Sequence, residues 1–408
     1  MKILFVHQNF PAQFRHTATA LAADSGNQVM ALSINAPTFP TPGVNVVRYR
    51  TQRGSTKGIH PLAMDFETKV IRGEAAAQAA LELSKGGFRP DIVIVHPGWG
   101  EHLFLKDVWP DARFLVFLEF YYQAKGYDYA FDPEFSQGTL QGRARLRTKN
   151  ASLLGGFDIM DRGISPTHWQ KSSMPPVYHD RINVIFDGID TRFISPDAAA
   201  TFTLPDGRSV KHGDEVLTFV NRNMEPYRGF HIFMRALPAI QKARPEAITL
   251  IVGGEDVSYG ARPVGGGSWK DVMLREVGDR LDMSRIVFLG KIPYDDYRQL
   301  LRVSRVHAYL TYPFVLSWSM LESLAAECLV IASATAPVTE VIKTGDNGIL
   351  VDFFDIEDWI RKITRALGKP DDYHDIRRQA RRDIVNRYDL NTVCLPAQLK
   401  LIRQVAAM

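Results

Sequence analysis

Two arginines and a glutamate in the second half of the chain have side chains suited to binding a nucleotide diphosphate. Arg222 and Arg228 follow the apolar run 216–221, and Glu322 stands near the start of a helix-like segment. Paired guanidinium groups can clamp a diphosphate, and a carboxylate can accept hydrogen bonds from the two hydroxyls of a ribose. The free N–H groups of a helix N-terminus would add a favourable place for phosphate.

The same residues also have plain structural explanations. Arg222 and Arg228 could be solvated surface arginines, one of them paired with Glu225. Ser319 and Glu322 have the spacing of a capping box, in which the glutamate binds the backbone amide of the N-cap residue. A cation at the start of a helix is unfavourable unless an anion is present, and this favours a ligand near Arg228.

Polar side chains also stand at the ends of apolar runs in the first half. His7 and His96 each follow such a run, and Glu119 ends another. Ligands of open parallel sheets bind beyond the carboxyl ends of strands, where these groups could bind a hydroxyl or exchange its proton. A lone histidine at a strand end is also a common packing residue, so both roles stay open. The other residues expected in this first-half cleft are Asn9, Phe10, Trp99 and Glu101.

Strand-like runs alternate with helix-length segments along the whole chain. The runs are short, continuous and rich in β-branched residues, which is typical of parallel strands covered on both faces. The sequence therefore predicts an α/β protein with two doubly wound, Rossmann-like domains, separated within the polar stretch 187–214. The predicted strands are 2–6, 28–33, 44–48, 91–95, 113–120, 158–165, 182–186, 216–221, 248–253, 286–290, 306–310, 329–333 and 348–352.

The composition argues against several classes of protein. With 45% hydrophobic and 23% charged residues the chain is expected to fold, and a net charge of +4 does not point to nucleic acid. Two cysteines cannot form a disulfide framework or a zinc site alone. No run approaches the ~18 apolar residues of a membrane span, and the N-terminal apolar run is too short for a signal peptide. The expected location is the cytoplasm. No GxGxxG follows a strand, which disfavours an NAD-dependent dehydrogenase.

Two other features allow two interpretations each. The basic clusters 142–150 and 376–382 could be solvated surface, or could contact anionic lipid or a lipid-linked acceptor at the inner face of the membrane. The glycine-rich loop 254–270 could allow close approach to a ligand, or could simply be flexible.

Three elements of the second half carry a family resemblance. They are the strand followed by Arg222 and Arg228-Gly229, the segment FLGKIPYDDYRQLLRVSRVHAYLT, and the segment LESLAAECLVIASATAPVTEVIKTGDNGILV. In this order they resemble the donor domain of retaining glycosyltransferase family 4, which has the GT-B fold. The resemblance covers nearly all of 216–352 and implies that Glu322 binds the ribose and Ile292 lies against the nucleobase. The other donor-binding residues that it implies are Asn221, Ser317, Trp318, Ser319 and Met320.

The chain departs from this family at the reacting centre. Eight residues before Glu322 lies Phe314, where the family has a glutamate that contacts the donor sugar. In the first half, HQNFPAQFRH and HPGWGE resemble one bacterial subgroup with its own acceptor domain. Glu119 stands where many relatives carry a histidine, so it could serve as a base or a hydroxyl anchor.

The resemblance implies an enzyme with two domains facing a cleft. Residues 1–195 would bind the acceptor, residues 196–387 would bind the nucleotide sugar (UDP or GDP), and a helix over 388–408 would cross back onto the first domain. A sugar would pass to a hydroxyl of a saccharide or lipid-linked glycan, with retention and without metal or other cofactor. The catalytic residues would be His96, Glu119, Arg222 and Arg228. A nucleotide-sugar epimerase or hydrolase and, because of Phe314, a non-catalytic nucleotide-sugar-binding subunit remain as alternatives.

Overall fold

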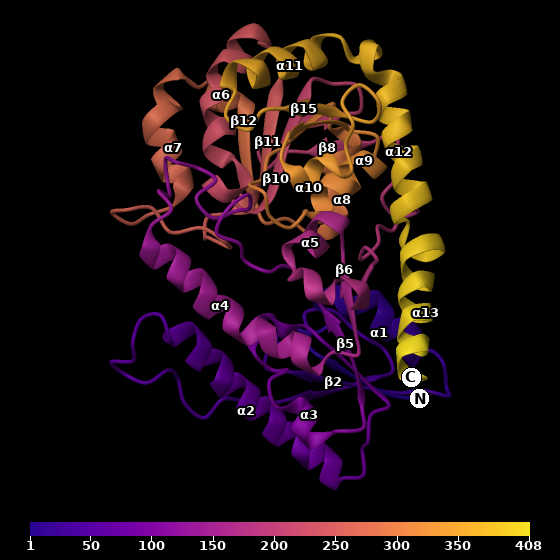
Figure 1. Ribbon diagram of the computed structural model, residues 1–408. Coiled ribbons are helices and arrows are strands. Elements are labelled where there is room, and N and C mark those ends of the chain that lie inside the picture. Colours follow the sequence, from indigo (N-terminus) through magenta and orange to yellow (C-terminus); the bar gives the residue numbers. More distant parts are fainter. The chain divides into compact units, whose positions relative to one another are not determined.

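The structure is a computed structural model that describes all residues from 1 to 408, and the chain forms two compact units (Figure 1). Unit 1 consists of Met1–Gly188 and Asn391–Met408, and unit 2 consists of Ile189–Leu390. Each unit is built on its own parallel sheet with helices packed against it. The expectation of an α/β protein with two Rossmann-like domains is therefore confirmed.

The sheet of unit 1 has the strand order β3-β2-β1-β4-β5-β6-β7, and all of its pairings are parallel. The order reverses between β1 and β4, and such a reversal is where ligand sites form in open α/β sheets. The strands are β1 (Lys2–Val6), β2 (Gln28–Ser33), β3 (Val44–Arg48), β4 (Ile92–Val95), β5 (Arg113–Phe117), β6 (Arg162–Ser165) and β7 (Ile182–Val184).

Helices cover both faces of this sheet, because alternate residues of β1 enter two different cores. Leu4 and Val6 pack with residues of α2 and α4, which lie side by side in Figure 1. Ile3 and Phe5 pack with α1 and with α13 at the end of the chain. The helices of unit 1 are α1 (Arg15–Ala22), α2 (Met64–Lys85), α3 (Leu105–Val108), α4 (Leu140–Ile159), α5 (His168–Ser173) and α13 (Leu395–Ala406).

Four strands of unit 1 are shorter than predicted: β4 begins at Ile92, β5 ends at Phe117, β7 ends at Val184, and β6 differs most. The expected strand 158–165 begins only at Arg162, because α4 continues through Ile159. The helix α13 is tied to the core of unit 1 by Leu401, Ile402 and Val405, which are all buried.

The main sheet of unit 2 has the order β12-β11-β10-β13-β14-β15 and is also entirely parallel. Its strands are β10 (Val216–Asn223), β11 (Ile248–Gly254), β12 (Ile286–Gly290), β13 (Val306–Tyr309), β14 (Leu329–Ser333) and β15 (Ile349–Val351). Its helices are α6 (Phe230–Ala243), α7 (Trp269–Val277), α8 (Tyr294–Val303), α9 (Trp318–Ala325), α10 (Ala336–Thr339), α11 (Ile356–Gly368) and α12 (His374–Tyr388).

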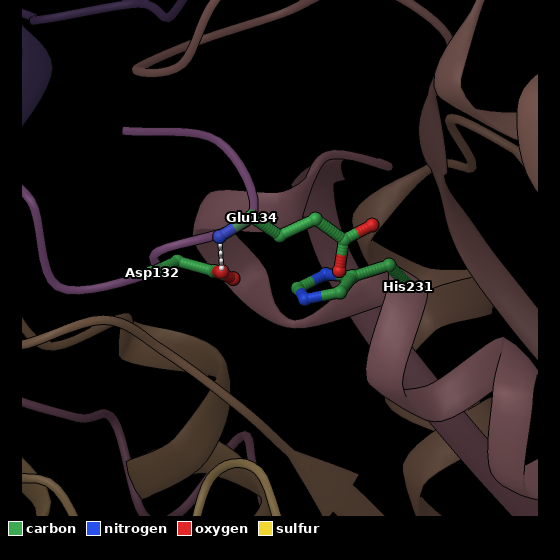
Figure 2. A group of neighbouring side chains, drawn as sticks. All are labelled: Asp132, Glu134 and His231. Carbon is green, nitrogen blue, oxygen red and sulfur yellow. Dashed lines mark hydrogen bonds between the residues drawn. The ribbon is translucent and has the colours of Figure 1, made fainter. Parts of the chain in front are cut away.

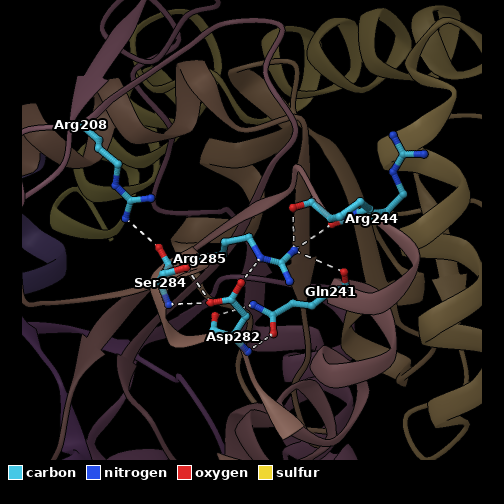
Figure 3. A network of polar contacts seen from close by, with 7 residues as sticks. Arg208, Gln241, Arg244, Asp282, Ser284 and Arg285 are labelled. Atoms are coloured by element: carbon cyan, nitrogen blue, oxygen red, sulfur yellow. Dashed lines mark hydrogen bonds and ion pairs between the residues drawn. The ribbon is translucent and has the colours of Figure 1, made fainter.

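Unit 2 also contains a small antiparallel pair that the sequence did not predict. Strands β8 (Thr201–Thr203) and β9 (Ser209–Lys211) lie within the polar stretch 187–214 and bury Phe202 and Val210. Near this pair, Arg208 donates to the carbonyl of Ser284, in a polar network that also joins Arg285 to Asp282 (Figure 3). This network precedes β12, so it lies at the amino ends of the strands and not at the edge where ligands bind.

The structure can be compared with the expectations for membrane-spanning segments and for the two basic clusters. No helix of either unit has the length and apolar character needed to cross a membrane. In the cluster 376–382, Arg381 is half-buried and donates to the backbone carbonyls of Thr191 and Ile194. This arginine is therefore held by protein contacts, whereas Arg143, Arg145 and Arg147 of the other cluster are exposed on α4.

Candidate functional site

The two arginines of unit 2 lie in different surroundings at the carboxyl end of β10. This strand runs to Asn223, two residues beyond the predicted end, so that Arg222 is part of the strand and its side chain is exposed, while Asn221 is buried. Arg228 ends a 3₁₀ turn just before α6 and is only 5% exposed. The solvated-surface explanation therefore does not hold for Arg228.

Arg228 is held by neutral groups from the segment that follows β13. One of its terminal nitrogens donates to Thr311 Oγ1 at 2.7 Å and to the carbonyl of Val315 at 3.1 Å. Gly229, with a φ of 68°, lets the turn approach β13 closely, because a side chain there would collide with Leu310. The buried guanidinium thus binds a hydroxyl and a carbonyl, and no carboxylate forms a hydrogen bond with it. An anionic ligand would supply the missing negative charge.

Glu225, which could have been the partner of an arginine, instead binds the backbone of a loop. Its side chain is completely buried and accepts hydrogen bonds from the backbone amides of Ser258, Tyr259 and Gly260, at 3.0, 3.2 and 2.9 Å. Glu225 therefore fixes the start of the glycine-rich loop. This contact brings the ring of Tyr259 to Arg228, whose guanidinium carbon lies 5.1 Å from the ring centroid.

Phe314, at the position where the resemblance would place a glutamate, belongs to an aromatic cluster around this loop. Its ring is buried and lies 5.2 Å from that of Tyr227 and 5.0 Å from that of Tyr259, measured between centroids. The cluster packs beside Arg228. The position therefore supplies apolar packing where the family pattern would supply a carboxylate.

The capping-box explanation of Glu322 is wrong. Helix α9 begins two residues earlier than Ser319 would require as N-cap, and its N-cap is Ser317, whose hydroxyl accepts from the amide of Ser319 at 3.3 Å. Glu322 therefore lies beyond the first turn. It accepts hydrogen bonds from the phenols of Tyr294, at 2.5 Å, and Tyr297, at 2.9 Å. Burial raises the pKa of Glu322, and the two phenols oppose this shift.

The other residues expected to bind the donor lie in α9 or in the short link before α8. Ser319 and Met320 are buried in α9, whereas Trp318 at its start is 45% exposed. Ile292 is half-buried in the short link between β12 and α8. The structure thus brings Glu322, Ser317 and the segment that binds Arg228 into one stretch after β13, and no contact joins Arg222 to it.

In unit 1 the structure brings four of the expected residues together. His7 and His96 follow the neighbouring strands β1 and β4, and their ring centroids lie 5.4 Å apart. The ring of Trp99 lies 4.5 Å from each of them. His96 Nε2 lies 3.5 Å from Oε2 of Glu119, which follows β5. Both imidazoles are buried, and burial, followed by the neighbouring His96, lowers the pKa of His7 to about 2.

The remaining residues expected in this cleft have mainly structural contacts. Phe10 is completely buried and packs against Phe5, so it contributes to the core. Asn9 presents its backbone amide to His7 Nδ1 at 2.9 Å. Glu101 is completely buried and accepts a hydrogen bond from the phenol of Tyr49 at 2.7 Å, and burial raises its pKa.

Sequence reasoning missed several residues of both units. Gln13 donates to Glu119 Oε1 at 3.4 Å, and Tyr294 and Tyr297 bind Glu322. The only local signal was the spacing of the two tyrosines on one face of a predicted helix. An acidic turn of unit 1 was also missed, in which the amide of Glu134 donates to Asp132 Oδ1 at 3.0 Å (Figure 2). His231, drawn in the same figure, belongs to α6 of unit 2.

Both halves of the chain match families of known proteins. Residues 25–194 match the family model described as Glycosyl transferase family 4 group, and residues 204–383 match Glycosyl transferases group 1. D-inositol 3-phosphate glycosyltransferase from Mycolicibacterium smegmatis is 27% identical over 220 residues, which cover 52% of this chain and 46% of that protein. The protein of the same name from Rhodococcus jostii is 26% identical over 194 residues, covering 47% and 40%. The match thus spans less than half the length of these relatives.

Solved structures resemble the chain over its whole length. Sucrose-phosphate synthase from Thermosynechococcus elongatus has a TM-score of 0.73 at 18% identity, covering 100% of this chain and 99% of that one. HepE from Anabaena, in complex with UDP-glucose, has a TM-score of 0.66 at 15% identity and full coverage of both chains, 100% each. At such identities the likeness shows the fold alone. Together with the two matched family models, it shows that the chain belongs to the glycosyltransferases of the GT-B fold.

Proposed function

We propose that this protein transfers a sugar from a nucleoside-diphosphate sugar to a hydroxyl of a saccharide or lipid-linked glycan. The observation that carries the proposal is the buried guanidinium of Arg228, whose contacts are with the uncharged groups Thr311 Oγ1, the carbonyl of Val315 and the ring of Tyr259. A buried cation without a bound carboxylate is costly, so a ligand with negative charge would stabilise it. The donor diphosphate is such a ligand.

Unit 2 would bind the donor. Arg228 and the exposed Arg222 would contact the diphosphate from the carboxyl end of β10, and Glu322 would accept the ribose hydroxyls. Ile292, before α8, would lie against the base. HepE, which is solved with UDP-glucose, makes a uridine nucleotide the first donor to test.

The chemistry would need no protein nucleophile. The bond between the anomeric carbon and the diphosphate oxygen breaks, and the acceptor oxygen forms its bond to the same face of that carbon. The acceptor proton passes to the departing diphosphate, and the configuration is retained. Arg222 and Arg228 would stabilise the charge that grows on the leaving group, the role that a divalent metal has in DxD enzymes.

A second candidate function follows from Phe314. Its ring occupies the aromatic cluster with Tyr227 and Tyr259, so the carboxylate that would contact the donor sugar is replaced by an apolar surface. This favours, as the alternative, a protein that binds nucleotide sugars without transferring them. An epimerase or hydrolase acting on the donor alone is distinguished by incubating the nucleotide sugar without an acceptor, since it would consume the donor under that condition.

Calorimetric titration with UDP, GDP and ADP tests the donor site directly. The wild-type protein should bind one of these diphosphates, and Arg228→Ala should weaken that binding by at least about 10-fold, since a charge-assisted hydrogen bond contributes ~1.5–3 kcal/mol. Arg275→Ala, on the exposed face of α7, is the matched control and should bind as the wild type does. Equal binding by Arg228→Ala and the wild type would contradict the proposal.

A further inference from the structure

The two buried histidines of unit 1 each have one ring nitrogen engaged by the backbone. His7 Nδ1 accepts a hydrogen bond from the amide of Asn9 at 2.9 Å, and His96 Nδ1 accepts one from the amide of Gly98 at 3.0 Å. A nitrogen that accepts a hydrogen bond carries no proton, so in both neutral rings the proton resides on Nε2. Both imidazoles are therefore fixed as Nε2–H donors.

Both Nε2–H groups are buried, and neither makes a hydrogen bond of normal geometry. His96 Nε2 lies 3.5 Å from Oε2 of Glu119, beyond an ordinary hydrogen bond. The side chain of Gln13 has a hydrogen-bonding interaction with His7, which opposes the lowering of the His7 pKa by burial. Buried donors are costly to leave unpaired, so an oxygen atom brought to this place would complete them.

The Glu119 carboxylate is approached by donors on both oxygens. Gln13 donates to Oε1 at 3.4 Å, and His96 faces Oε2. The backbone of Glu119 is also held, since its carbonyl accepts from Gln170 Nε2 at 2.8 Å. Each carboxylate oxygen has two lone pairs, so a carboxylate that already accepts hydrogen bonds can accept another from a ligand.

We propose that Glu119 binds the reacting hydroxyl of the acceptor, and that Gln13 and His96 are positioning residues that orient its carboxylate. This inference rests on the proposed function. A hydroxyl group matches the site because its O–H can donate to Glu119 while its oxygen accepts from an imidazole Nε2–H. A phosphate or carboxylate group does not match, because the Glu119 carboxylate would repel it. The group recognised here is therefore a neutral alcohol, such as a saccharide hydroxyl, with Trp99 beside it for the sugar ring.

The fixed tautomers also decide which residue can accept a proton. An Nε2–H imidazole whose Nδ1 is already engaged has no lone pair to offer the acceptor, so neither His7 nor His96 serves as the base. Glu119 is then the group of unit 1 that can accept a hydrogen bond from the hydroxyl and polarise its O–H bond before the proton passes to the leaving diphosphate.

Two substitutions of His96 separate positioning from a structural role. In His96→Gln the amide nitrogen takes the place of Nε2 and keeps the donor toward Glu119, but the contact with Gly98 is lost. In His96→Asn the amide oxygen takes the place of Nδ1 and keeps the contact with Gly98, but the donor is lost. The proposal predicts that His96→Gln retains kcat within about threefold, whereas His96→Asn loses about 100-fold, as expected for a misplaced catalytic group. The reverse order would overturn it.

Gln13 and Glu119 extend the test. Gln13→Ala should lower kcat/KM for the acceptor about 10-fold, Glu119→Gln should lower it about 100-fold, and neither should change nucleotide affinity, which depends on unit 2. Unchanged acceptor kinetics in both variants would overturn the role of Glu119.

The tautomers can be observed without any activity. In ¹⁵N-labelled protein, long-range ¹H–¹⁵N spectra should show a protonated Nε2 and an unprotonated Nδ1 for both His7 and His96. A protonated Nδ1 on His96 would overturn the positioning proposal, even if the protein transfers sugar. If the tautomers are as predicted but the protein binds no nucleoside diphosphate and transfers no sugar, the proposed function is wrong. The role of Glu119 toward the acceptor is then wrong as well.

Discussion

The phenol of Tyr294 donates a hydrogen bond to Oε1 of Glu322 over 2.5 Å, although the two residues are 28 positions apart in the chain. Tyr297 binds the other oxygen from a buried position, whereas Tyr294 is 47% exposed and stacks on Phe193 at 5.4 Å between ring centroids. The carboxylate proposed to receive the ribose therefore already has a phenol on each oxygen. Of the two phenols, only that of Tyr294 can move away from Glu322 without disturbing the core.

Removal of the Tyr294 hydroxyl should strengthen nucleotide binding. In Tyr294→Phe the ribose no longer competes with a phenol for Glu322, so the affinity for the preferred nucleoside diphosphate should rise about 3- to 10-fold, the value of one ordinary hydrogen bond of ~1 kcal/mol. Calorimetry measures this directly. Weaker binding by Tyr294→Phe would show instead that the phenol itself contacts the nucleotide.

The matched change at Tyr297 should act on stability. Tyr297→Phe leaves a buried oxygen of Glu322 without its donor, which should lower the free energy of unfolding by about 1–3 kcal/mol. Urea denaturation of Tyr297→Phe and Tyr294→Phe compares the two. Equal stability losses would contradict the distinction between a buried and an exchangeable phenol.

The pH dependence of stability should carry the signature of Glu322. Because burial raises its pKa, the folded protein holds a proton that the unfolded chain has already lost, and the unfolding free energy falls as pH rises through this window. Glu322→Gln cannot titrate. Its stability relative to the wild type should therefore increase as pH rises from about 4 towards neutrality, measured by urea denaturation at several pH values. A constant difference would mean that the carboxyl is not shifted.

His102 should produce the opposite slope in unit 1. Burial lowers its pKa to about 4, so between this value and its ordinary value of 6.5 the unfolded chain binds a proton that the folded one does not. Stability is present above 6.5 and is lost as pH falls through this window, by up to roughly 3 kcal/mol.

His102→Gln tests this slope, because its amide can keep the hydrogen bond that His102 Nε2 makes with the carbonyl of Ser152, at 2.8 Å. The variant should lose less stability than the wild type between pH 7 and pH 5. The same loss in both proteins would assign the acid sensitivity to other groups.

Glu225 should control the mobility of the loop beside Arg228. Glu225→Ala removes the acceptor of three consecutive amides, so hydrogen exchange at Ser258, Tyr259 and Gly260 should accelerate and stability should fall by about 2 kcal/mol. Glu255→Ala is the control, because this residue makes only a surface ion pair with Lys270, worth less than ~1 kcal/mol. Unchanged exchange in Glu225→Ala would contradict the anchoring role.

The sequence predicted the fold well because its signal is repeated. Each continuous β-branched run, such as 2–6 or 329–333, became a parallel strand. The strand ends of the unit 1 sheet place His7 and His96, and those of the unit 2 sheet place Arg228. Short elements gave no such signal. The three-residue strands β8 and β9 were missed for that reason.

Contacts between distant segments lay beyond the sequence. The spacing of Ser319 and Glu322 fitted a capping box, but the helix starts from Ser317, and the partners of Glu322 come from α8. Gln13 likewise has no motif of its own, and its contact with Glu119 spans 106 positions. Such pairs are fixed by strand order and packing, which no local pattern records.

Sugar transfer itself is tested most directly by incubating UDP-glucose, or the sugar of whichever nucleotide binds, with a panel of saccharide acceptors and following products by mass spectrometry. The account predicts a glycosylated acceptor and free nucleoside diphosphate in equal amounts with the wild-type protein. With Arg228→Ala the rate should be at least about 100-fold lower, and with Arg275→Ala it should be unchanged. Transfer by Arg228→Ala at the wild-type rate, or tight nucleotide binding by the wild type without transfer to any acceptor, would contradict it.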